Sequence, residues 1–142
     1  MIIVEKLLFL RHVSLFSALP AKELGRIAAI AEEVIYPAGA SIVKEGEFGE
    51  CMFLIVEGTV AISRGSKSLA ALGPRDYFGE MSILDGEPRS ASASALTDCL
   101  LLRIDQREFQ GILARHFEAS LGIIKTLCGR LRAQMSQQQT IR

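Results

Sequence analysis

The residues best suited to chemistry lie between Tyr77 and Ala91, in the stretch YFGEMSILDGEPRSA. Gly79 lets the backbone come close to a ligand, and the segment from Glu80 to Leu84 has the composition of a short helix whose first amides lack intrahelical partners. Such a helix start attracts phosphate. Pro88 ends the helical stretch, so we expect Arg89 to begin a strand that faces back over the helix start. A guanidinium there would bind two oxygens of a phosphate, and the stretch therefore predicts an anion site.

Glu80 needs a partner other than the phosphate, because an anion repels a carboxylate. A sugar hydroxyl is a suitable partner, since an ionised carboxylate accepts hydrogen bonds. A ligand that carries a phosphate and a hydroxyl on one small ring would satisfy Arg89 and Glu80 together, and a cyclic nucleotide has that shape. The alternative is an ion pair between Glu80 and Arg89 that closes a loop. The local chemistry alone leaves both interpretations open.

The composition indicates one domain of ordinary size with no strongly charged surface. The chain has 142 residues, of which 49% are hydrophobic, and Lys+Arg equals Asp+Glu at 16 each. This balance disfavours binding to nucleic acid or to an acidic membrane surface. No stretch approaches the roughly 18 uninterrupted apolar residues that span a bilayer. Cys51, Cys99 and Cys128 lie far apart without CxxC spacing, which is typical of reduced thiols in a cytoplasmic protein.

The order of apolar runs and glycines predicts an α+β fold that is mainly β. Two short amphipathic helices are expected at Ile2–Arg11 and Ala21–Glu32. From about residue 33 to 104, apolar runs cut by glycine and proline predict a double-stranded β-helix, that is, a jelly-roll-like β-roll. The expected strands are Val34–Tyr36, Ser41–Val43, Met52–Val56, Thr59–Ser63, Ser68–Leu72, Arg89–Ala95 and Cys99–Ile104. Small residues alternate in the sixth strand, which leaves room for a ligand.

The helical period returns after the last strand. Asp105 is a plausible N-cap, and two helices are expected within about residues 105–135. A single domain over residues 1–136 and a disordered tail over residues 137–142 complete the prediction. The longer helix carries apolar residues at heptad spacing, namely Phe117, Leu121, Ile124, Cys128, Leu131 and Met135. This seam either lies across the roll or pairs with another chain, as a homodimer or with a larger effector protein.

Together these features resemble the cyclic nucleotide-binding domain shared by cyclic-AMP receptor transcription factors, regulatory subunits of cyclic-AMP-dependent protein kinase and cyclic-nucleotide-gated channels. The resemblance covers about residues 13–134. The family's phosphate-binding cassette reads Phe-Gly-Glu, a short apolar stretch, a loop, and then Arg, a small residue and Ala. Phe78–Glu80 and Arg89–Ala91 match this pattern without a gap, and Gly46 and Gly58 stand at two turns that the family uses.

The resemblance implies a role for each cassette residue. Arg89 would neutralise the cyclic phosphate, Glu80 would accept a hydrogen bond from the ribose 2′-hydroxyl, and Ser90 would donate to the phosphate. Serine at that position favours cyclic AMP (cAMP) and leaves cyclic GMP (cGMP) open. The ligand-binding set that the resemblance implies is Phe78, Gly79, Glu80, Met81, Ser82, Arg89, Ser90 and Ala91.

The last helix corresponds to the family's lid over the purine. The polar candidates for a contact with the base are Lys125, Arg130 and Arg132, each of which could instead form part of a solvated basic edge. Ile83 stands where the family has a hydrophobic hinge, so ligand binding is expected to move the lid helix. The resemblance thus implies a non-enzymatic cAMP sensor in a bacterial cytoplasm. It implies no cofactor, no metal, and no contact with nucleic acid or membrane through this domain.

Two other functions fit parts of the sequence. The same fold could act as an interaction module with an empty pocket, although intact Glu80 and Arg89 argue against this because an empty pocket would leave charge buried without compensation. A metal-dependent enzyme of the cupin kind would need histidines clustered inside the roll. His12 and His116 instead lie in the helical flanks.

Overall fold

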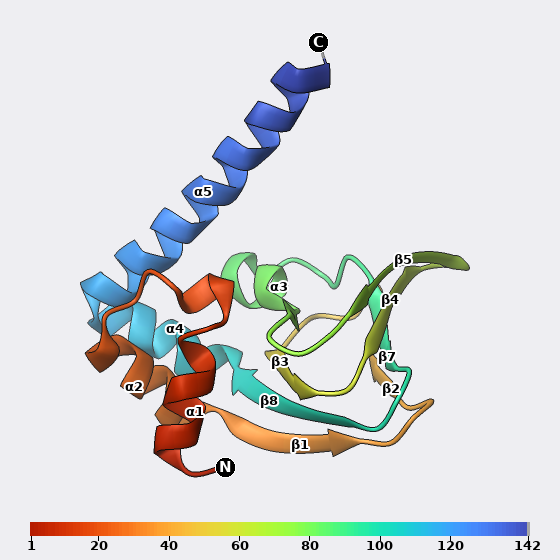
Figure 1. Ribbon diagram of the computed structural model, residues 1–142, viewed down its shortest axis with the longest axis horizontal. Coiled ribbons are helices and arrows are strands. Elements are labelled where there is room, and N and C mark those ends of the chain that lie inside the picture. The colour runs from red at the N-terminus through yellow and green to blue at the C-terminus, as the bar shows by residue number, and fades with distance from the viewer. Residues whose placement is uncertain (142) are drawn as a thin grey trace.

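The computed structural model describes the backbone of residues 1–141 and the side chains of residues 1–137. A β-roll lies beside a group of helices that comes from both ends of the chain (Figure 1). The helices are α1 (Ile3–Leu10), the 3-10 turn η1 (Ser14–Phe16), α2 (Ala21–Ile30), α3 (Glu80–Asp85), α4 (Gln106–Arg115) and α5 (Phe117–Ile141). The strands are β1 (Glu32–Tyr36), β2 (Ser41–Val43), β3 (Cys51–Glu57), β4 (Val60–Arg64), β5 (Lys67–Leu72), β6 (Tyr77–Phe78), β7 (Ser92–Ala95) and β8 (Cys99–Asp105).

Within these residues the strands form two four-stranded antiparallel sheets. One has the order β1-β8-β3-β6 and the other the order β2-β7-β4-β5. Except for the β4–β5 hairpin, consecutive strands lie in different sheets, as in a jelly roll, so the predicted fold class is confirmed.

Strands β3 and β8 are buried on both faces because the first sheet separates two hydrophobic cores. Met52 and Leu54 of β3 face the helices, where they join a cluster that includes Phe16, Ile27 and Phe109. The residues between them, Phe53 and Ile55, join the core inside the roll. This alternation follows from the two-residue period of a strand. It also explains why the sequence of β3 shows one continuous apolar run instead of alternating polar and apolar residues.

The ends of most elements differ from the sequence prediction by one or two residues, and the differences at α2, β6 and β7 have structural causes. Helix α2 ends at Ile30, because Glu32 is already the first residue of β1, where it pairs with Arg103 of β8. The short strand β6, which pairs with β3, was not predicted as a strand. Strand β7 begins at Ser92, so the prediction that Arg89 starts a strand is wrong. Pro88 has no amide proton for a ladder, and the backbone of Arg89 instead bonds to the loop that contains Glu47.

Helix α5 is longer and more exposed than predicted. It continues to Ile141, since the glutamine-rich segment contains no glycine or proline that would stop it. Arg142, the last residue of the predicted disordered tail, lies outside the described residues. The predicted seam does not lie across the roll, since Phe117, Ile124 and Leu131 are 74%, 53% and 59% exposed.

The buried face of α5 is a different one. Ala119 and Ile123 are buried in the helical core, and Gly122 lies so close to Leu19 that a β-carbon would overlap it. The base of α5 therefore packs against the segment around η1, and the rest of the helix projects away from the body (Figure 1). Among the described residues, no helix combines the length and apolar character needed to cross a bilayer.

Candidate functional site

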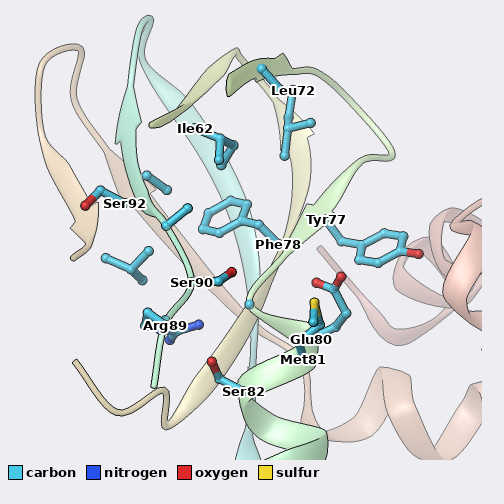
Figure 2. Close-up of a pocket in the computed structure, with 15 residues that line it drawn as sticks. Ile62, Leu72, Tyr77, Phe78, Glu80, Met81, Ser82, Arg89, Ser90 and Ser92 are labelled. Atoms are coloured by element: carbon cyan, nitrogen blue, oxygen red, sulfur yellow. The ribbon is translucent and has the colours of Figure 1, made fainter. Parts of the chain in front are cut away.

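A cavity of about 260 Å³ opens between the start of α3 and the inner face of the second sheet. Figure 2 shows its polar end, where Arg89, Ser82, Ser90 and Glu80 gather, and its apolar end near Ile62 and Leu72. The structure brings the whole predicted ligand-binding set together on this cavity: Phe78, Gly79, Glu80, Met81, Ser82, Arg89, Ser90 and Ala91.

Arg89 is the buried cation of the cavity, with only 7% of its surface exposed. Its backbone amide donates to the carbonyl of Glu47 at 2.7 Å, and its carbonyl accepts from the amide of Gly46 at 3.0 Å. Its Nη2 donates to the carbonyl of Cys51 at 2.7 Å. Its Nη1 is buried and has no hydrogen-bond partner among the described residues. A buried charged donor without a partner is costly, and an anion in the cavity would satisfy it.

Two glycines make room for the Arg89 guanidinium. Gly79 has a φ of 86°, and a β-carbon on it would overlap Arg89 Nη1. A β-carbon on Gly49 would lie 2.6 Å from the β-carbon of Ser82 and 2.9 Å from Cζ of Arg89. A side chain at either glycine would therefore displace the guanidinium. Only Gly79 belongs to the predicted set, because Gly49 lies outside the cassette pattern.

Glu80 faces the same cavity from the first turn of α3, with 15% of its side chain exposed. Burial raises the pKa of its carboxyl group, an effect that a hydrogen bond from the backbone and the charge of Arg89 partly offset. Its Oε1 lies 3.6 Å from Nη1 of Arg130. No ion pair joins Glu80 to Arg89 in the described part of the chain, so the structure does not support a loop closed by that pair.

Arg130 is the lid candidate that reaches the site. Besides its contact with Glu80, its guanidinium lies 5.1 Å from the centre of the Tyr77 ring, a cation-π geometry. Lys125 is exposed, and the structure shows no contact between it and the site. Arg132 is also exposed and lies with Cys128 and Leu131 on the outward face of α5. The structure therefore does not place Lys125 or Arg132 at the site.

Several residues of the cavity were not predicted. Tyr77 lies at the edge of the cassette, and its hydroxyl is 3.3 Å from Oγ of Ser14. The apolar wall comes from strands of the second sheet and consists of Val43, Ile62, Ala70, Leu72 and Ala93. The alternation of small residues in β7 was a signal for Ala93. The others look like ordinary core residues in the sequence.

The end of α3 is joined to α4 by a hydrogen bond. Ile83 is fully buried in the helical core, which also contains Phe109 of α4. Nε2 of Gln110 donates to the carbonyl of Ile83 at 2.9 Å. A movement of α3 toward the cavity would therefore shift or break this contact with α4, and α4 directly precedes α5 in the chain.

Comparison with known proteins agrees with this geometry. The sequence model of the cyclic nucleotide-binding domain matches residues 33–116, more than half of the chain. This chain belongs to the cyclic nucleotide-binding domain family. The match includes the complete cassette and every strand of the roll except the first residue of β1.

Three relatives illustrate the range of the family. A cyclic nucleotide-gated potassium channel of Rhizobium etli is 38% identical over 124 residues, which make up 83% of this chain and 35% of the channel. A cyclic AMP receptor protein of Thermus thermophilus is 32% identical over 123 residues, which make up 83% of this chain and 57% of that protein. The chain thus spans less than two thirds of either relative. The regulatory domain of Toxoplasma gondii PKA, solved with cAMP, has a TM-score of 0.74 and 26% identity over 78% of this chain and 44% of that chain.

The alternative of a metal-dependent enzyme finds no metal site in the described residues, where no three side chains of His, Cys, Asp or Glu form a group that could hold a metal ion. His12 follows α1, and His116 separates α4 from α5.

Cys51 lies beside Arg89, with its Sγ 3.9 Å from Nη2, and burial raises the pKa of this thiol.

Proposed function

We propose that this chain is a cAMP-binding regulatory domain that transmits ligand binding to its C-terminal helix. The observation that carries the proposal is the buried, unpaired Nη1 of Arg89 in a cavity that also presents the carboxylate of Glu80. A cation without a partner calls for an anion, and a nearby carboxylate calls for a hydroxyl donor. The phosphate and the 2′-hydroxyl of a cyclic nucleotide supply both on one rigid ring.

In this proposal the nucleotide lies along the polar-to-apolar axis of the cavity. The phosphate binds Arg89 and Ser90, and the ribose 2′-hydroxyl donates to Glu80. The purine then lies toward the apolar wall that includes Ile62 and Leu72. The cAMP bound to the related PKA domain and the serine at position 90 support cAMP over cGMP.

The proposed output is a movement of α5. In the structure Arg130 of α5 pairs with Glu80, the group that the ribose would engage. A ribose hydroxyl at Glu80 competes with Arg130 for this carboxylate, and the contact between Ile83 and Gln110 carries a movement of α3 to α4. Both routes end in α5, so the helix has different contacts in the free and bound states.

The direct test is calorimetric titration of the purified chain with cAMP, cGMP and the linear nucleotide 5′-AMP. We expect one site per chain, with cAMP bound more tightly than cGMP and 5′-AMP bound weakest because its phosphate and ribose are not held on one ring. Heat from neither cyclic nucleotide, in a sample that circular dichroism shows to be folded, would overturn the proposal.

The exposed stripe on α5 favours a second role, in which two copies of the chain associate through this helix. The stripe consists of Phe117, Ile124, Cys128, Leu131 and Met135, all exposed. An apolar stripe of this length promotes association in water. We expect Leu131→Glu to shift sedimentation toward the monomer. Ala133→Glu, which adds the same charge at an exposed position off the stripe, should leave sedimentation unchanged. A parent chain that sediments as a monomer at high concentration would exclude this association.

A further inference from the structure

Outside the cassette, one side chain grips the backbone of the proposed phosphate-binding turn. Nε of Arg64, the last residue of β4, donates to the carbonyl oxygen of Ser90 at 3.0 Å. Arg64 does not line the cavity, and its side chain is exposed. The contact joins the end of the β4–β5 hairpin to the residue that follows Arg89.

The hairpin end is itself held in place. Oε1 of Glu45 accepts a hydrogen bond from the amide of Gly65 at 3.1 Å. The amide of Glu45 donates to Oγ of Ser92 at 2.9 Å. The end of the hairpin is thus bonded to Glu45, which is bonded to Ser92 at the start of β7. Arg64 adds a third connection, from this hairpin to Ser90.

The carbonyl that Arg64 holds controls the direction of an amide. The C=O of Ser90 and the N–H of Ala91 belong to one planar trans peptide unit and point in opposite directions. Ala91 lines the cavity, and no hydrogen bond to its amide is present in the described residues. Fixing the carbonyl on the outer side therefore leaves the Ala91 amide free to face inward, toward an anion.

We propose that Arg64 is a positioning residue for the anion site, which it serves by orienting the Ser90–Ala91 peptide instead of by its charge. The inference rests on the proposed function for its ligand, the cyclic phosphate. It extends the binding machinery to a residue of β4 that precedes the cassette by more than a dozen positions.

The test compares Arg64→Ala with Lys67→Ala by calorimetric titration with cAMP. Lys67 pairs with Arg64 across the same hairpin, so its substitution removes an equal charge nearby and leaves Ser90 untouched. We expect Arg64→Ala to weaken binding about fivefold, the effect of losing one hydrogen bond that orients the site, and Lys67→Ala to bind like the parent.

Salt and amide exchange separate positioning from charge. If Arg64 positions the turn, Arg64→Ala should weaken cAMP binding by the same factor at about 0.1 M and at about 1 M salt. Over this range the Debye length falls from about 10 to 3 Å, so an effect of charge would shrink. Amide exchange of Gly46 and Arg89, which hold the same turn, should also rise in ligand-free Arg64→Ala but not in Lys67→Ala.

A binding defect that disappears at high salt, or parent-like binding together with unchanged exchange, would overturn the role of Arg64 while leaving the proposed function intact. If the parent chain bound no cyclic nucleotide, the proposed function would fail. The exchange comparison in the ligand-free protein would then decide by itself whether Arg64 orders the turn.

Discussion

Arg89 and Glu80 face one cavity, but different parts of the molecule hold them. Arg89 is fixed entirely within the roll, through its backbone to Gly46 and Glu47 and through its guanidinium to Cys51. Glu80 stands at the joint between the roll and the helices, where its carboxylate lies 3.6 Å from Arg130 of α5. One end of the site is held within the roll, and the other end contacts α5, the helix that the proposed function moves.

This difference separates affinity from response. A phosphate that binds Arg89 meets a group that is already buried and oriented, so most of the binding free energy should come from that end. A hydroxyl that binds Glu80 competes with Arg130 for the same carboxylate. The ribose end should therefore contribute less affinity and more of the coupling to α5. The following predictions test this division, beginning with the largest effect.

Removing the rigid cation should nearly abolish binding. We expect Arg89→Ala to raise the dissociation constant for cAMP about 100-fold, because a bidentate charge-assisted contact is lost. Ser90→Ala, which removes one neutral donor, should cost only about threefold. Both variants should remain folded by circular dichroism. Calorimetric titration measures both constants, and parent-like affinity in Arg89→Ala would show that the cavity does not bind a phosphate through this residue.

Removing the carboxylate should have a smaller and more selective effect. Glu80→Ala should weaken binding of cAMP about tenfold, and Glu80→Gln less, because the amide oxygen still accepts a hydrogen bond. The 2′-deoxy analogue of cAMP should bind the parent poorly and should lose little further affinity in Glu80→Ala. Equal losses for cAMP and its analogue in this variant would show that Glu80 does not contact the ribose.

The raised pKa of Glu80 predicts how binding depends on pH. The ionised carboxylate is the form that accepts the hydroxyl, so affinity for cAMP should fall as the pH drops through a range above that of an ordinary glutamate. The effect on the ligand-free fold has the opposite sign. A raised pKa means that protonation favours the folded state, and this contribution to the free energy of unfolding is lost as the pH rises through the raised value. Titrations across this range should show the dependence in the parent and not in Glu80→Gln.

The smallest effect on affinity is expected on the α5 side of the comparison. Arg130→Ala should change the affinity for cAMP about threefold at most, since it removes a partly exposed ion pair and a cation-π contact. Its effect on α5 should be larger. In the parent, cAMP should slow amide exchange between about Leu127 and Met135, and in Arg130→Ala this difference should shrink. If cAMP slowed amide exchange in α5 of Arg130→Ala as much as in the parent, the coupling would run through the contact between Ile83 and Gln110 instead of through Arg130.

The jelly roll and the cassette could be predicted because their signals are local. Glycines and prolines mark the turns of the roll, and the residues from Phe78 to Ala91 lie close together in the sequence, so their joint presence at one cavity needs no long-range contact. Arg64 and Tyr77 escaped this reasoning. An arginine at the end of a hairpin and a tyrosine beside a glycine have no distinctive pattern until the fold brings them to Ser90 and Arg130.

The orientation of α5 could not be predicted for a physical reason. The apolar stripe beginning at Phe117 is the most hydrophobic face, yet the face that packs is built on Ala119, Gly122 and Ile123. Small residues allow the helix to approach Leu19 closely and pack tightly against it. A prediction based on hydrophobicity alone misses this contribution to packing. That choice of face turns Arg130 toward the cavity and Arg132 away from it.

The anchoring of α5 at its base makes the helix a lever. Ala119 is buried, Arg130 lies at the site, and the helix continues to Ile141. At a rise of about 1.5 Å per residue, Arg130 lies about 16 Å from that pivot and Ile141 about 33 Å, so a straight helix about doubles at its far end any sideways shift of Arg130. An exchange of partners at Glu80 that moves the arginine by about 1 Å would displace the end of the helix by about 2 Å. At Met135, the last residue of the exposed stripe, the same movement would be about 1.5 Å, enough to disturb the packing of a second helix seated there.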